Sequence, residues 1–120
     1  MDNLAALILV SIIFIILGLL LRYLTPGINR FYGYRTKTSM ASQENWDFSQ
    51  KYSGGLFAIF GLILLLIAIV VGNAEIDLAN NTGKLIVVIL ILSSIITTIL
   101  LTEIALKKQG DLRKNEPPDR

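Results

Sequence analysis

The chain has 120 residues, of which 53% are hydrophobic and 17% charged, and its formal net charge is +2. It contains no cysteine and no histidine, which excludes disulfides within the chain, thiolate chemistry and the usual soft-metal sites. We therefore expect neither a metal nor a cofactor, and the length fits a single domain.

The apolar residues are concentrated in three uncharged segments, at residues 4–21, 56–72 and 85–102. Each is close to the roughly 20 residues that a helix needs to cross a bilayer. Three helices that are apolar on every face would leave so short a chain no soluble surface. Asp2, rather than a basic region, precedes the first segment, so we expect it to remain as a span and not to be a cleaved signal peptide. We predict one all-α integral membrane domain over residues 1–120, with three transmembrane helices at about 4–24, 55–73 and 84–105.

The arginines and lysines predict the orientation. Five lie in residues 22–51, five in residues 107–120, and one, Lys84, lies between these two groups. Basic residues mark the cytoplasmic side of a membrane protein. The N-terminus is therefore predicted to lie outside, with a cytoplasmic loop at residues 25–54 and a cytoplasmic tail at residues 107–120. The tail mixes charges of both signs and has few apolar residues, so we expect it to be flexible.

The second half of this loop has a helical pattern. Ser42 is placed to cap a helix, and Trp46, Phe48 and Tyr52 fall on one face of it. This pattern predicts a short amphipathic helix at the cytoplasmic interface before the second span. Ser53-Gly54-Gly55 then provides a bend or a point of close packing.

The first half of the loop, "NRFYGYRT" at residues 29–36, is harder to explain as a membrane anchor. Gly33 stands between Tyr32 and Tyr34, where we expect a backbone conformation that the aromatic residues do not adopt readily. The resulting turn would fix Arg30 and Arg35 beside the two rings. We therefore place the function in this segment.

No catalytic set is recognisable in the sequence, because it has no nucleophile–base pair, no phosphate loop and no paired carboxylates within a span. We predict that the protein is not an enzyme. Nucleic-acid binding is not predicted either, since membrane topology already accounts for the basic residues.

The third apolar segment carries Ser94, Thr98 and Thr102 at four-residue spacing. This stripe would either hydrogen-bond to neighbouring helices or line a polar pathway. Glu103 is the carboxylate closest to a span, and we expect it to be a polar partner. Two kinds of partner are open, an arginine of the loop or, as we favour, Lys107 one turn further along.

The loop motif resembles the signature of the SdpI family of bacterial immunity proteins against the sporulation-delaying protein toxin. That signature has an Asn, a Gly-aromatic-Arg-Thr, usually a Pro, then a Ser, and a Trp followed four residues later by Asn. The matching residues here are Asn29, Gly33, Tyr34, Arg35, Thr36, Ser39 and Trp46. Two places depart from it: Lys37 stands at the usual Pro, and Ser49-Gln50 at the usual Ala-Asn. The resemblance covers the loop and the second span, while the third span matches in kind only.

The resemblance implies a non-enzymatic protein of the bacterial cytoplasmic membrane that confers immunity to, or senses, a membrane-active peptide toxin. The implied partners are the lipid bilayer, a hydrophobic peptide toxin, and a cytoplasmic repressor or another membrane protein. As an alternative, the chain would be a small transporter that forms a homo-oligomer through Gly54, Ala58 and the Ser/Thr stripe. The candidate binding residues are Asn29, Arg30, Gly33, Tyr34, Arg35, Thr36, Ser39, Trp46 and Gln50.

Overall fold

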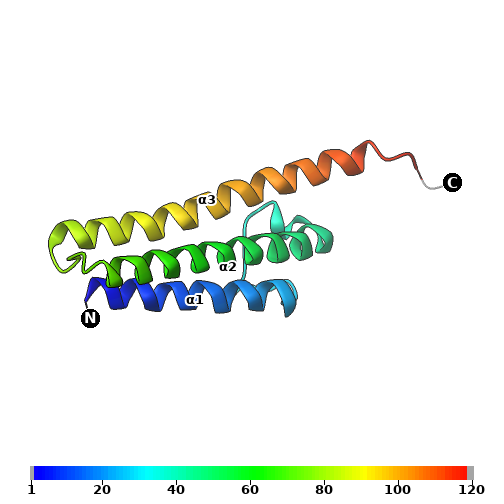
Figure 1. Cartoon of the computed structure of the whole chain (residues 1–120). Coiled ribbons are helices and arrows are strands. Elements are labelled where there is room, and N and C mark those ends of the chain that lie inside the picture. The colour runs from blue at the N-terminus through cyan, green and yellow to red at the C-terminus, as the bar shows by residue number, and fades with distance from the viewer. Residues whose placement is uncertain (1, 119–120) are drawn as a thin grey trace.

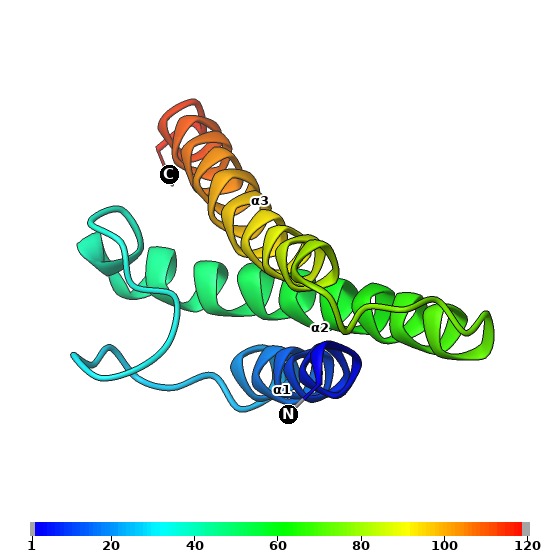
Figure 2. The ribbon, with the colours of Figure 1, turned by 90° about the vertical axis from the view of Figure 1, so that its left-hand side faces the viewer.

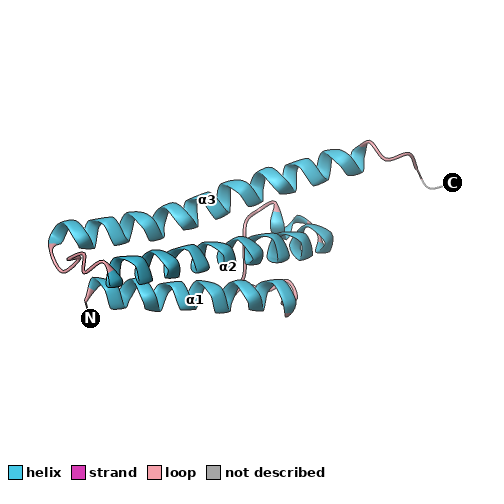
Figure 3. Ribbon diagram, viewed as in Figure 1, coloured by secondary structure: helices cyan, strands magenta, loops and turns pink. Residues whose placement is uncertain are grey.

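Three long helices form the protein in the computed structural model, which describes residues 2–118. Within that range the secondary structure is entirely helical (Figure 3). Each long helix contains a segment long and apolar enough to cross a membrane. The prediction of an all-α fold with three transmembrane helices is therefore confirmed. The elements are α1 (Asn3–Tyr23), the 3-10 helix η1 (Ser39–Ala41), α2 (Gln43–Asn73) and α3 (Asn81–Lys114).

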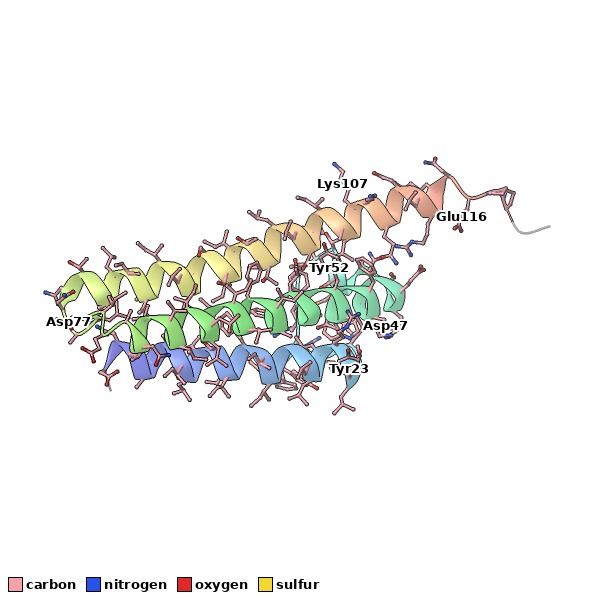
Figure 4. All side chains as sticks on the ribbon, viewed as in Figure 1. Tyr23, Asp47, Tyr52, Asp77, Lys107 and Glu116 are labelled. Carbon is pink, nitrogen blue, oxygen red and sulfur yellow. The ribbon has the colours of Figure 1, made fainter. Side chains whose placement is uncertain are left out.

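The three helices run up, down and up in an elongated bundle of 64 × 23 × 21 Å, with α2 between α1 and α3 (Figures 1 and 2). Asp77 lies at one end, which we call the turn end because residues 74–80 join α2 to α3 there. Asp47 lies at the opposite end (Figure 4), which we call the loop end because it carries residues 24–42. Apolar side chains cover the sides between these ends, as contact with lipid requires.

Side-chain caps fix the starts of the three helices. The Asp2 carboxylate accepts a hydrogen bond from the Ala5 amide at 2.7 Å, and the Asn80 side chain accepts one from the Gly83 amide at 2.8 Å. The Ser42 hydroxyl accepts a hydrogen bond from the Asn45 amide at 3.0 Å, so Ser42 is the N-cap that the sequence predicted. Each cap satisfies an amide that has no partner within its own helix.

Small residues bring α1 and α2 into backbone contact. A Cβ added to Gly54 would lie 2.6 Å from the Gly18 carbonyl oxygen, and one added to Gly61 would lie 2.8 Å from the Ser11 carbonyl oxygen. Packing of this kind is typical of helices in lipid, where close van der Waals contact replaces the hydrophobic effect. Gly54 and Ala58 therefore face α1 of the same chain, whereas our alternative interpretation placed them between copies of the chain.

The core lies on the sides of the helices that face one another. Its buried members come from all three helices, and Phe14 packs edge to face on Phe57 with ring centroids 5.1 Å apart. The buried core residues are Leu7, Phe14, Leu64, Ala68 and Val87.

The predicted interfacial helix is not a separate element. Residues 43–52 are helical, but they form the first turns of α2, which continues through Gly54 and Gly55. Trp46 does not face lipid, because its side chain is 0% exposed. The helix stays continuous because Trp46 and Gln50 are buried against the loop, whereas an interfacial helix would turn its aromatic face to lipid.

The predicted flexible tail is helical in its first part. α3 continues to Lys114, and Arg113 forms an ion pair with Glu44 at 2.6 Å and a hydrogen bond to Asn45 at 2.6 Å. Leu106, just before the predicted tail, is also buried. These contacts stabilise a segment whose composition alone predicted no structure. Asp119 and Arg120, the end of the predicted tail, lie outside the described residues.

The Ser/Thr stripe forms its hydrogen bonds within α3. The hydroxyls of Ser94, Thr98 and Thr102 donate to the carbonyl oxygens four residues earlier, at 2.7–2.8 Å. This corrects the expected bonds to neighbouring helices, and its physical reason is that a helical Ser or Thr reaches that carbonyl directly. All three side chains are buried, so the stripe is a packing surface.

Candidate functional site

Asn29 shapes the start of the loop motif. Its side-chain oxygen accepts hydrogen bonds from the amides of Phe31 and Tyr32, both at 2.8 Å, and its side-chain NH₂ donates to the Gly27 carbonyl at 2.9 Å. Asn is suited to this task because its side chain can cap a turn of its own backbone. The residue therefore positions the motif.

Gly33 occupies a backbone conformation that favours glycine. Its φ is +108°, and no other glycine among residues 2–118 has a positive φ. A Cβ at this position would lie 2.7 Å from the side-chain oxygen of Gln50. Conformation and space therefore both call for glycine here.

Gln50 binds the peptide groups on both sides of Tyr34. Its side-chain oxygen accepts a hydrogen bond from the Tyr34 amide at 2.7 Å, and its NH₂ donates to the Tyr34 carbonyl at 2.8 Å. The Gln50 side chain is 0% exposed. The Gln50 side chain thus pairs with a backbone N–H and a backbone C=O of the loop, as a neighbouring strand does in a sheet. Without it, burial would leave these two groups unpaired.

Ser39 and Thr36 close the next turn. The Thr36 amide donates to the Ser39 hydroxyl at 2.8 Å, and the Ser39 amide donates to the Thr36 hydroxyl oxygen at 3.1 Å. The buried Ser39 hydroxyl also lies 3.1 Å from the Tyr34 carbonyl oxygen. This reciprocal pair holds the motif in position just before α2 begins.

Trp46 fastens the start of the loop to α2. Its indole N–H donates to the Pro26 carbonyl oxygen at 2.7 Å, which satisfies the one polar group of this buried ring. The ring also packs beside Gly33, since a Cβ there would lie 3.4 Å from the Trp46 Cη2 atom. Trp46 therefore packs against the turn at Gly33 and stabilises it.

Glu103 joins the motif to α3. One of its carboxylate oxygens accepts hydrogen bonds from the hydroxyls of Tyr34 and Thr36, each at 2.7 Å. Burial, followed by the hydrogen bond to Glu103 and its negative charge, raises the pKa of Tyr34 well above the ordinary value for a phenol. The phenol is therefore a stable donor at neutral pH.

The expected ion pair of Glu103 is not formed. Among the described residues Glu103 has no cationic partner within salt-bridge distance, and Lys107 extends away from the bundle (Figure 4). The physical reason is that two hydroxyl donors already lie against the Glu103 carboxylate. The loop arginines that we considered as alternative partners do not pair with it either.

The two arginines of the motif remain outside this hydrogen-bonded unit. Arg30 and Arg35 are both exposed, and within residues 2–118 neither makes an ion pair. Arg35 lines a cleft beside the motif, whereas Arg30 does not. The two arginines, which are close together in the sequence motif, therefore have different surroundings in the structure.

The cleft has a volume of about 430 Å³ and lies between α1 and α3, with α2 behind it. The loop motif closes it at one end. The sequence did not reveal it, because its aliphatic lining cannot be told from lipid-facing residues by pattern. Its lining residues are Phe14, Leu17, Leu20, Leu21, Tyr32, Gly33, Tyr34, Arg35, Thr36, Phe57, Ile95 and Ile99.

The family model for the SdpI/YfhL protein family matches residues 25–102. This match spans the loop motif, α2 and most of α3. The chain belongs to the SdpI/YfhL family. A relative in Bacillus subtilis (strain 168), named "Uncharacterized protein YfhL", is 33% identical over 94 residues, which cover 78% of each chain. No solved structure matches.

Membership in the SdpI/YfhL family agrees with the resemblance drawn from the loop motif, and the match extends further than we predicted because it includes the third span. α1 precedes the matched range, and Glu103 follows directly after it. All nine predicted motif residues lie inside the match. The hydrogen-bonded unit is therefore built by the matched part of the chain, except for Glu103.

Proposed function

We propose that this SdpI/YfhL protein acts without catalysis, conferring immunity to a membrane-active peptide toxin or sensing it. The observation that carries the proposal is that the family motif forms one hydrogen-bonded unit attached to two different helices. Gln50 holds Tyr34 from α2, and Glu103 holds the same residue from α3. SdpI-type proteins are not a known family of enzymes, which supports a binding role.

This arrangement suits a loop that changes shape when a ligand binds. A peptide that binds beside the bundle and displaces α3 relative to α2 would act on Tyr34 from both sides. The loop would then change shape, because its turn is held by side-chain contacts and not by a helix. The outward face of the loop, where Phe31 is 92% exposed, is then the surface for a cytoplasmic repressor or another partner.

The protective role is tested by expressing the chain in a bacterium that is sensitive to the sporulation-delaying protein toxin. We expect survival at toxin concentrations that kill cells with an empty vector, with no change in sensitivity to gramicidin. Unchanged killing with the protein present in the membrane would contradict the proposal.

The role of the motif is tested with three variants at matched membrane abundance. We expect Arg35→Ala and Trp46→Ala to lose most of the protection, and Lys107→Ala, a basic residue on the outer side of α3, to retain it. Arg35 is the informative position, because its exposed side chain supports no buried contact. Equal effects of all three variants would mean that the loop serves only as an anchor.

The proposed orientation places the loop in the cytoplasm, supported by the five basic residues at positions 22–51. The absence of native cysteine makes single-cysteine labelling clean. We expect a membrane-impermeant maleimide to label Asp77→Cys in intact cells and Lys37→Cys only after permeabilisation. The reverse pattern would invert the topology.

A further inference from the structure

We propose that the cleft between α1 and α3 binds one acyl chain of an anionic phospholipid, whose phosphate pairs with Arg35. This inference does not require toxin recognition, although Arg35 enters both proposals. It depends on the shape of the cleft, the distribution of polar groups along it, and the absence of an ion-pair partner for Arg35.

The apolar part of the cleft suits a hydrocarbon chain. Its walls are aliphatic side chains of α1 and α3, and the edge-to-face pair of Phe14 and Phe57 lies at its inner surface. Leu17 and Ile99 line it and are also exposed, at 48% and 41%. The cleft therefore opens sideways onto the surface that faces lipid, so a chain can enter from the bilayer.

The polar groups lie at one end only. Tyr32, Arg35 and Thr36 line the cleft where the loop closes it, and the Thr36 hydroxyl already donates to Glu103. Arg35 is thus the one charged group in the lining, and it has no ion-pair partner among residues 2–118. A guanidinium binds phosphate oxygens with directed, charge-assisted hydrogen bonds.

The form of the cleft suits a lipid chain. Its volume is about 430 Å³, and all of its lining residues other than those of the loop are apolar. An apolar slot of this volume with a single cation at its end matches a molecule that has one charged head and a slender tail.

Trp46 provides a built-in reporter for the test. It is the only tryptophan of the chain, and its ring packs beside Gly33, which lines the cleft. The purified full chain in detergent micelles is titrated with phosphatidylglycerol or phosphatidylcholine brominated on the acyl chain. Quenching of the Trp46 fluorescence then reports a brominated chain in the cleft.

We expect phosphatidylglycerol to quench at a lipid fraction about two- to fivefold lower than phosphatidylcholine. Both lipids carry the phosphate, but the choline cation offsets its charge beside Arg35, and an exposed ion pair is worth up to about 1 kcal/mol. Arg35→Gln should abolish this preference, while Arg30→Gln, an equal loss of charge outside the cleft, should retain it. Equal quenching by both lipids in the wild type would overturn the proposal. So would a loss of the preference for phosphatidylglycerol that is equal in Arg35→Gln and Arg30→Gln. A synthetic apolar helical peptide is added as a competitor. If it restores the Trp46 fluorescence equally with both lipids, the cleft is a peptide site instead.

Discussion

At the scale of single residues, the motif is a set of side chains that bind backbone. Asn29, Ser39 and Gln50 each satisfy peptide groups of the loop. The two arginines of the motif, Arg30 and Arg35, are exposed and form no ion pair within residues 2–118. The turn at Gly33 could be predicted, because a glycine between two tyrosines indicates a conformation that the rings avoid. The bonds from Tyr34 to Gln50 and Glu103 could not be predicted, since no local pattern indicates which distant polar group a buried residue meets.

The turn at Gly33 gives a prediction at this scale. Gly33→Ala must place a Cβ at a φ of +108° and beside the Gln50 side chain, so we expect a loss of about 1–3 kcal/mol in unfolding free energy. Equilibrium unfolding of the chain in detergent measures this. Gly27→Ala is the matched control, because nothing lies within 4 Å of its added Cβ. A loss of equal size in both variants would show that the loop does not hold Gly33 in this conformation.

At the scale of elements, the apolar segments predicted which parts of the chain are helical but not where α2 begins and α3 ends. Both boundaries depend on contacts between distant parts of the chain. Burial of Trp46 and Gln50 favours a continuous start of α2, and the contacts of Leu106 and Arg113 extend α3 to Lys114. Hydropathy detects the portion of a helix within lipid, and it does not detect turns that other parts of the protein stabilise.

The close contact of α1 with α2 gives a prediction at this scale. A Cβ on Gly18 would meet the backbone of Gly54 and Ala58, which cannot move aside as a flexible side chain can. We expect Gly18→Ala to cost about 1–3 kcal/mol in unfolding free energy by forcing the helices apart. Gly110→Ala has open space around its Cβ and should be neutral or up to about 1 kcal/mol stabilising. Thermal unfolding in detergent compares the two, and a Gly18→Ala variant as stable as the wild type would contradict the packing.

At the scale of the whole molecule, α3 runs close to the other helices near the turn end and diverges from them toward the loop end (Figure 1). Two polar connections bridge the divergence. Glu103 binds the loop, and further along α3 Arg113 binds Glu44 and Asn45. The cleft opens beside the first of these connections, so the architecture places a lipid-accessible space next to the contact that holds the loop.

The outer connection gives a prediction at this scale. The side chains of Arg113 and Glu44 are 33% and 58% exposed, so Arg113→Gln should cost less than about 1 kcal/mol in global stability. Locally, we expect faster amide hydrogen exchange over residues 107–114, because the end of α3 loses its attachment to α2. Lys114→Gln removes the same charge one residue later and should leave exchange unchanged. Unaltered exchange in Arg113→Gln would mean that Leu106 alone holds this end of the helix.

The satisfied backbone of the loop has a consequence for the thickness of the surrounding bilayer. Irregular chain is normally kept in water, because unpaired amides and carbonyls are costly in hydrocarbon. Gln50 supplies both hydrogen bonds around Tyr34, and the hydroxyls of Tyr34 and Thr36 reach a carboxylate on α3. The peptide groups of Tyr34 therefore need no hydration and can lie at the depth of the lipid headgroups, while the exposed Arg30 and Arg35 stay in contact with water. The leaflet at the loop end can then keep its full thickness beside the short helix α1. It does not have to become thinner to expose the loop backbone to water.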